Sequence, residues 1–161
     1  MNTTKTRKML CFDMDGTIAD LYNVPDWLPM LRSENVTPYV VAEPLHDMEK
    51  LRTILIALSK QGWEIRVISW LSMDSSESYK KAVRKAKIDW LCKHSFPMDR
   101  VHLIAYGSTK ADSVRKATDY AVLIDDNHKV CQGWTLGHTI NPTETNLIEE
   151  LNKLLDTERG N

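Results

Sequence analysis

Short apolar runs alternate with amphipathic segments along most of this chain. The apolar runs predict five strands, over Met9–Phe12, Trp63–Trp70, Arg100–Tyr106, Tyr120–Asp125 and Thr135–Ile140. Apolar side chains at helical spacing predict helices over Asp47–Gln61, from Asp74 to about His94, over Ser108–Ala117, and from Asn141 along a face that ends at Leu155. Strands that alternate with helices imply right-handed crossovers, so we expect an α/β fold with a Rossmann-like parallel sheet of about five strands and helices on both faces.

Local signals set the expected starts of two helices. Asp74, with Glu77 three residues later, is typical of a helix start. Asn141 is a typical N-cap, because Pro142 follows at the first helical position and Glu144 stands at the third.

The segment Ile18–His46 interrupts the alternation. It contains four prolines and several aromatic residues, and it is too long for a simple strand-to-helix loop. We interpret it as a minimal cap insert, with one or two helical turns over the site, in a single domain of residues 1–161. The alternative is an ordered surface excursion that has no role at the site.

Composition and charge narrow the classes of protein. The 161 residues are 42% hydrophobic and 27% charged, and the formal net charge is −1. The overall charge therefore gives no long-range attraction to nucleic acid or to an anionic membrane, although a local basic patch is still compatible with the sequence. No apolar stretch is long enough to span a membrane. Three scattered cysteines indicate reduced thiols, so we expect a cytoplasmic protein.

Carboxylates follow two of the predicted strands. Asp13 and Asp15 come after the first, and Asp125 and Asp126 close the fourth. Ligands of parallel sheets bind beyond the carboxyl ends of the strands. An Asp-x-Asp pair converges where the backbone turns sharply, which Gly16 permits. Converging carboxylates repel and need a shared proton or a cation, and a hard divalent ion, Mg²⁺ above all, is the simplest answer.

Four motifs in order resemble those of the haloacid dehalogenase (HAD) superfamily. They are Phe12-Asp13-Met14-Asp15-Gly16-Thr17, Val67-Ile68-Ser69, Lys110 in Gly107-Ser108-Thr109-Lys110-Ala111-Asp112, and Leu123-Ile124-Asp125-Asp126. The match covers roughly residues 8 to 140. The resemblance implies the HAD strand order 3-2-1-4-5 and phosphatase or phosphotransferase activity.

The resemblance also implies residue roles, which are physically reasonable. Asp13 would attack phosphorus and form an aspartyl-phosphate. Asp15 would protonate the leaving oxygen and then activate water. Mg²⁺ would be held by the Asp13 carboxylate, the Asp15 main-chain carbonyl and Asp125. Asp126 would support these ligands through water or through Lys110.

The phosphate and the rest of the substrate would have their own contacts. Ser69, Gly16 and nearby backbone N–H groups would hold phosphate oxygens, and Lys110 would balance the nucleophile and the phosphate. The layout resembles the small deoxyribonucleotidase-like members of the superfamily, which implies a nucleoside monophosphate as substrate. Tyr22, Trp27 and Trp70 are candidates to stack on a base, with core packing as the alternative for the two tryptophans.

Other functions stay open at this point. A polynucleotide 3′-phosphatase would use the basic residues of one helix, namely Lys80, Lys81, Arg84, Lys85 and Lys87, although a solvated helix face explains these residues better. A small protein-tyrosine or sugar phosphatase, or an inactive HAD-fold binding module, would also suit the chain. In an oligomer, a neighbouring subunit would cover a site that has little cap of its own.

Overall fold

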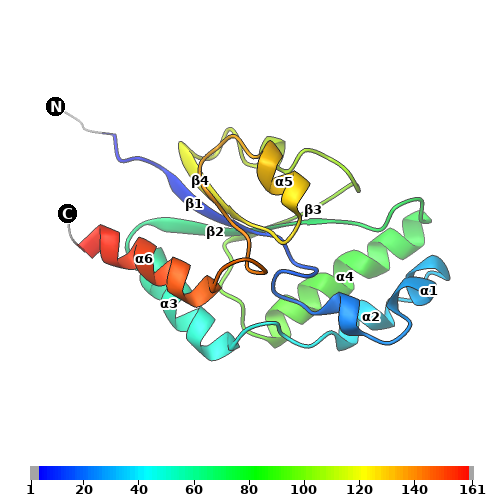
Figure 1. The fold of residues 1–161 in the computed structure, drawn as a ribbon. Coiled ribbons are helices and arrows are strands. Elements are labelled where there is room, and N and C mark those ends of the chain that lie inside the picture. The colour runs from blue at the N-terminus through cyan, green and yellow to red at the C-terminus, as the bar shows by residue number, and fades with distance from the viewer. Residues whose placement is uncertain (1–3, 160–161) are drawn as a thin grey trace.

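Five parallel strands form the centre of the structure, a computed structural model that describes residues 4–159 (Figure 1). The strands are β1 (Lys8–Phe12), β2 (Trp63–Trp70), β3 (Arg100–Ile104), β4 (Tyr120–Ile124) and β5 (Thr139–Ile140). Their order in the sheet is β3-β2-β1-β4-β5, which confirms the expected 3-2-1-4-5 topology. The register sets Phe12 of β1 beside Val67 and Ile124, so the residues after these strands meet at one edge.

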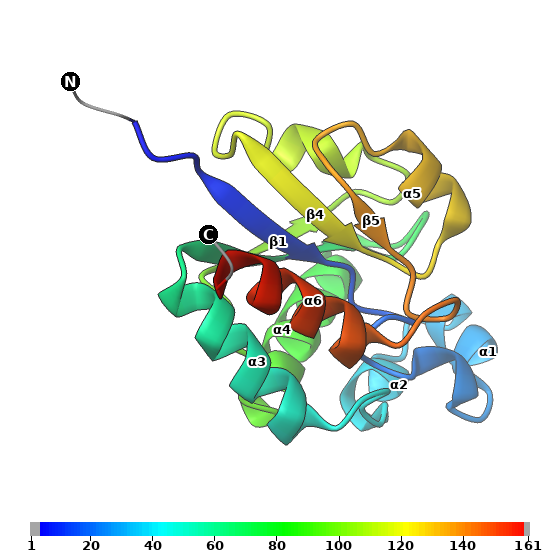
Figure 2. The same cartoon turned by 60° about the vertical axis from the view of Figure 1, so that its left-hand side comes forward.

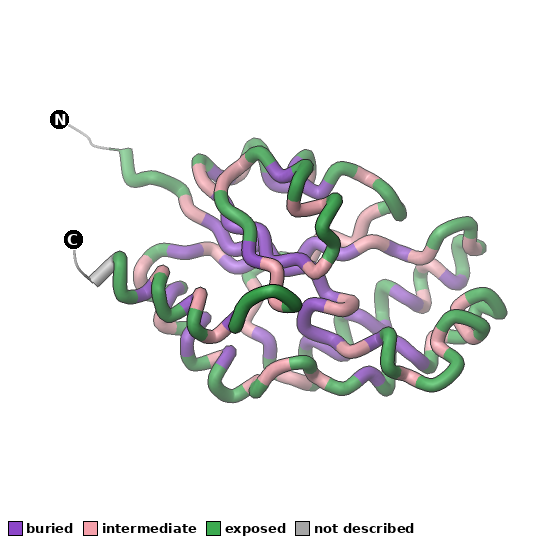
Figure 3. Tube along the Cα trace, viewed as in Figure 1, coloured by how far each residue is buried: buried purple, intermediate pink, exposed green. Residues whose placement is uncertain are grey.

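Helices cover both faces of the sheet (Figures 1 and 2). One face is packed against α3 (Met48–Lys60), α4 (Glu77–Lys93) and α6 (Leu147–Arg159), and the other against the 3-10 helix η2 (Lys110–Ser113) and α5 (His128–Gly133). Strand β1 is buried on both sides, since Leu10 and Phe12 face the first layer and Met9 and Cys11 face the second. The most buried trace accordingly runs along the sheet (Figure 3). None of the described helices combines the length and the apolar character that crossing a membrane requires.

Helix α4 begins at Glu77, so the predicted start at Asp74 is wrong. Asp74 has a φ of 51°, in the left-handed region, and therefore lies outside the helix. The cap is Ser76, whose hydroxyl accepts from the N–H of Tyr79. Ser76 is also tied to the insert, because its N–H and O–H both donate to the Glu34 carboxylate. The contact with Glu34 thus favours Ser76, and not Asp74, as the N-cap of α4.

Helix α6 begins at Leu147, so the predicted start at Asn141 is also wrong. The Asn141 side chain accepts from the N–H and the O–H of Thr143, which closes a separate turn. Asn146 accepts from the N–H of Glu149 instead and stands at the beginning of the helix. The Asn141 side chain therefore closes a turn and does not cap a helix.

The predicted helix over Ser108–Ala117 is reduced to η2 and a series of turns. Its apolar residues Ala111, Val114 and Ala117 recur every third residue, which is the period of a 3-10 helix. The crossover from β3 to β4 is therefore short, and Lys110 at its start is buried.

The insert Ile18–His46 holds more helix than expected. It contains the 3-10 helix η1 (Leu21–Asn23), α1 (Trp27–Arg32) and α2 (Thr37–Val41). Its two ends meet in an antiparallel bridge between Ala19 and Pro44. The insert packs on α4 and on the loop after β2, through an apolar cluster of its own made of Leu21, Tyr39, Leu71, Tyr79, Val83 and Ala86. It therefore lies beside the carboxyl ends of the strands (Figure 1).

Candidate active site

Two aspartates and a lysine meet where β1 and β4 end. Asp13 follows β1, and its N–H donates to the carbonyl of Ile124 over 2.8 Å, which ties it to β4. The Lys110 ammonium donates to Asp13 Oδ1 over 2.8 Å and to Asp125 Oδ2 over 2.7 Å. All three charged residues are buried, with exposed fractions of 8% for Asp13, 0% for Asp125 and 5% for Lys110. The structure therefore brings together three residues that the sequence motifs single out.

Thr17 is a site residue that the sequence reasoning missed. It is fully buried, and its Oγ1 lies 2.9 Å from Asp13 Oδ2 and 3.1 Å from Asp126 Oδ1, so that its single proton can serve either oxygen. The same hydroxyl accepts from the N–H of Asp126. The last residue of the first motif thus fixes the second oxygen of Asp13 and the start of the loop after β4.

Gly16 makes the turn after β1 possible. Its φ is +79°, and a Cβ at this position would overlap the Asp126 carboxylate and lie 2.6 Å from Cε2 of Tyr22. Its N–H donates to the carbonyl of Ala19 over 2.8 Å. Gly16, predicted to help bind phosphate, therefore uses its N–H within the turn, and its contribution is to shape the loop.

We expect Gly16→Ala to fold less stably and to lose most activity. The new methyl group must displace Asp126 or Tyr22, and the left-handed backbone costs about 1–3 kcal/mol for a residue with a side chain. Thermal unfolding and phosphate release measure the two effects. Gly133→Ala is the matched control, because its Cβ would meet no atom within 4 Å. Normal stability and turnover of Gly16→Ala would contradict the assigned role.

Asp15 faces a second buried lysine, Lys87 of α4. The Lys87 ammonium is 0% exposed and donates over 2.8 Å to Asp15 Oδ2 and over 2.8 Å to Ser69 Oγ. Burial raises the pKa of Asp15, and Lys87 opposes that rise. Ser69, predicted to bind phosphate, is 1% exposed and shares the Lys87 ammonium with Asp15; its contact with phosphate stays a prediction.

The placement of Lys87 corrects the interpretation of α4 as a basic outer face. Lys87 turns inward, Lys80 pairs with Glu77, and Lys85 pairs with Asp89. The basic stripe that would follow a nucleic-acid backbone is therefore reduced, although Lys81 and Arg84 remain exposed on it.

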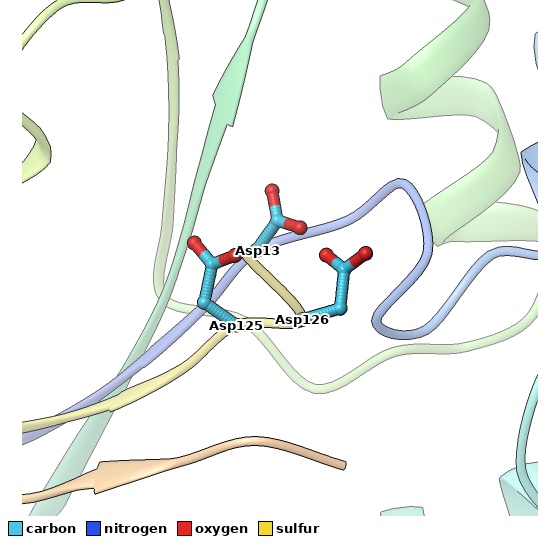
Figure 4. Close-up of side chains that lie close together, drawn as sticks. All are labelled: Asp13, Asp125 and Asp126. Carbon is cyan, nitrogen blue, oxygen red and sulfur yellow. The ribbon is translucent and has the colours of Figure 1, made fainter. Parts of the chain in front are cut away.

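Three carboxylates form a group that can hold a metal ion (Figure 4). Asp13, Asp125 and Asp126 each offer an oxygen, and these atoms lie within 4.8 Å of one another. Asp126, predicted to support the ligands indirectly, thus offers a carboxylate oxygen of its own. Burial, followed by the negative charge of Asp13, raises the pKa of Asp125 to about 6, and burial is also the main cause that raises the pKa of Asp126 to about 7.

The charges at this site fit a divalent cation. Asp13, Asp125 and Asp126 bring three carboxylates, and Lys110 brings one ammonium group that bonds to two of them. Two negative charges are left without a cationic partner among these groups. Hard oxygen donors with this charge suit Mg²⁺.

A cleft of about 370 Å³ opens above these carboxylates. Tyr22, Trp27 and Trp70, the three aromatic residues predicted to bind substrate, all line it. The rings of Tyr22 and Trp27 meet edge to face at 5.0 Å, and the indole N–H of Trp70 donates to the carbonyl of Ser108. Tyr39 of the insert and Tyr106 after β3 also line the cleft. The cleft thus joins a charged floor to largely apolar and aromatic walls.

Comparison with solved structures identifies the fold. The crystal structure of D,D-heptose 1,7-bisphosphate phosphatase from Burkholderia thailandensis matches with a TM-score of 0.54 and 11% identity, covering 92% of this chain and 98% of that one. A putative HAD-like phosphatase from Mesorhizobium loti matches with a TM-score of 0.55 and 13% identity, covering 96% and 88%. No family model and no curated protein matches the chain. The matches confirm the HAD-type fold that the four motifs imply.

Proposed function

We propose that this chain, which shares the fold of HAD-like phosphatases, is a Mg²⁺-dependent phosphomonoesterase that forms an aspartyl-phosphate on Asp13. The observation that carries the proposal is the arrangement of Asp13 on the cleft floor. Lys110 bonds one of its oxygens and Thr17 the other, while Asp15 stands two residues further along the same loop. A nucleophile held in this way needs little reorganisation to react.

In the first step, an oxygen of Asp13 attacks phosphorus and the bond from phosphorus to the leaving oxygen breaks. Asp15 gives its proton to that oxygen, which leaves as an alcohol. The Lys110 ammonium has three N–H donors. Two of them bond to Asp13 and Asp125, and no other acceptor in residues 4–159 takes the third. That N–H can hold a phosphate oxygen.

In the second step, Asp15 takes a proton from water, the water oxygen attacks phosphorus, and the bond to Asp13 breaks. Inorganic phosphate leaves and Asp13 is restored. Mg²⁺ would be held by Asp13, Asp125, Asp126 and the Asp15 carbonyl, and it would neutralise negative charge on the phosphoryl group.

The cleft favours a nucleoside monophosphate as substrate. Its aromatic walls offer faces on which a base can stack, and its volume of about 370 Å³ suits a small ligand. A sugar phosphate is the second candidate, because one structural neighbour is a heptose bisphosphate phosphatase. The pairing of Lys80 and Lys85 with acids weakens the case for a polynucleotide. An inactive binding module would have no physical reason to keep three carboxylates that repel one another.

The direct test is phosphate release by the purified chain in Mg²⁺ buffer. Deoxynucleoside monophosphates, sugar phosphates, a phosphotyrosine peptide and a 3′-phosphorylated oligonucleotide form the panel. Hydroxylamine trapping followed by peptide mass spectrometry then locates the acyl phosphate. We expect nucleotides to be preferred and Asp13 to carry the adduct. Turnover without an adduct on Asp13 would overturn the mechanism, and a preference for another class would overturn only the substrate.

Trp27→Ala should raise the KM for a nucleotide about tenfold, since a base that stacks on an aromatic ring gains about 1–3 kcal/mol. The kcat for a small aryl phosphate should hardly change, because the ring of Trp27 packs on Tyr22 and has no part in the proposed proton and phosphoryl transfers. Steady-state kinetics on both substrates check this. Val40→Ala is the control, since Val40 is an exposed residue of the same insert that does not line the cleft. An unchanged nucleotide KM would exclude stacking on Trp27.

A further inference from the structure

Lys87 is the one fully buried lysine among the described residues, and its surroundings are unusual for a lysine. It shares the inward stripe of α4 with Tyr79, Val83, Ala86, Trp90 and Leu91. A buried ammonium group is unfavourable unless it is paired and hydrogen-bonded. An apolar residue at this position would fill the same space, so core packing does not explain why the side chain is charged.

The three bonds of Lys87 show what it does. Its ammonium donates to Asp15 Oδ2, to Ser69 Oγ and to the carbonyl of Trp70, each over 2.8 Å. A lysine ammonium has three donors, so all of them end on the protein itself. Lys87 does not line the cleft and is 0% exposed. It therefore has neither a free donor nor a path to a bound phosphate, in contrast to Lys110, which lines the cleft and keeps one donor.

The insert closes the remaining side of Lys87. Its ammonium lies 5.1 Å from the ring centroid of Tyr39, and the Tyr39 hydroxyl is 2.9 Å from Ser72 Oγ in the loop after β2. The lysine is thus held between the first motif, the end of β2 and the insert. A carboxylate that is bonded to such a fixed group has little freedom to turn.

We propose that Lys87 is a positioning residue, which holds the Asp15 carboxylate in the orientation needed for proton transfer without touching substrate. This rests on the proposed function, because it requires Asp15 to act as acid and base. Loss of Lys87 leaves Asp15 free to rotate. Both proton transfers then suffer, while attack by Asp13 on a substrate whose leaving group needs no proton is spared.

The dependence of the reaction rate on the leaving group tests the role of Lys87. Lys87→Met is compared with wild type on phenyl phosphate, whose leaving oxygen needs a proton, and on 2,4-dinitrophenyl phosphate, whose leaving oxygen does not. We expect kcat/KM for phenyl phosphate to fall about a hundredfold or more, as for loss of general acid catalysis. With the dinitrophenyl ester we expect a burst of one dinitrophenol per enzyme, followed by slow turnover. Lys85→Met is the matched control, since Lys85 lies on the same helix and is exposed.

The outcomes separate this inference from the proposed function. Equal losses on both esters without a burst, or no loss at all, would overturn the role of Lys87. A wild type that forms no phosphoenzyme would overturn the proposed function instead. The double variant with Asp15→Asn adds a second criterion: Lys87→Met should cost little in that background, and a full additional loss would refute action through Asp15. If thermal melting shows that Lys87→Met does not fold, Lys87→Gln, which keeps an amide donor, takes its place.

Discussion

Replacing Asp13 with asparagine should lower phosphate release at least about a thousandfold, the scale of loss seen when a nucleophile is removed. The amide nitrogen and oxygen of asparagine keep the shape of the side chain but are poor nucleophiles towards phosphorus. The phosphoenzyme that hydroxylamine traps in the wild type should vanish. Single-turnover kinetics and mass spectrometry measure both effects.

The control for this prediction is Asp112→Asn. Asp112 is exposed and pairs with Arg115 on the surface, so its loss should leave turnover unchanged. An Asp13→Asn protein that still hydrolyses an aryl phosphate at the wild-type rate would remove Asp13 from the mechanism, and water attack on the substrate would have to replace the covalent step.

Chelation of divalent metal should stop turnover, and Mg²⁺ should restore it. Without a cation, the carboxylates of Asp13, Asp125 and Asp126 repel one another at the cleft floor. Mg²⁺ at about 100 times its dissociation constant should therefore raise the free energy of unfolding by about 2.7 kcal/mol. Asp126→Asn, which removes one charge with little change of shape, should weaken this stabilisation. Thermal melting with and without Mg²⁺ gives this answer independently of activity, and an equal Mg²⁺ response in both proteins would exclude Asp126 as a ligand.

The sheet and the central charged residues could be predicted because their signals are local. Each strand is an apolar run, and Asp13, Asp125 and Lys110 follow strands that meet at one edge of the sheet. Parallel topology then brings these residues together without any knowledge of side-chain packing.

Lys87 could not be placed in the same way. Its helix carries several lysines that together suggest one solvated face, but Lys87 stands at helical spacing from Val83 and Trp90 and so falls on the apolar stripe. Its burial depends on a bond to Asp15, which is 72 residues earlier in the chain, and on the insert that closes over it. Thr17 differs, since it stands inside the first motif, and that position was a signal in the sequence for its contacts with Asp13 and Asp126.

The predicted starts of α4 and α6 were wrong for a related reason. Asp74 and Asn141 are good capping residues, but several good candidates stand close together near each start. Ser76 is selected by its bonds to Glu34, a residue of the insert. A choice between equivalent local signals is thus made by a contact that only the folded chain contains.

The central position of β1 has a consequence for biosynthesis. Its neighbours in the sheet are β2 and β4, and β4 is made more than a hundred residues later (Lys8 pairs with Tyr120). A ribosome therefore releases Asp13 long before Asp125 and Lys110 exist. Contacts between residues so far apart in sequence form late and slowly in folding. A growing chain that ends before β4 has no assembled phosphoryl-transfer site, so activity cannot appear until β4 and Asp125 have been made. Recovery of catalysis during refolding would accordingly report the pairing of β1 with β4, which brings Asp13 to Asp125 and Lys110.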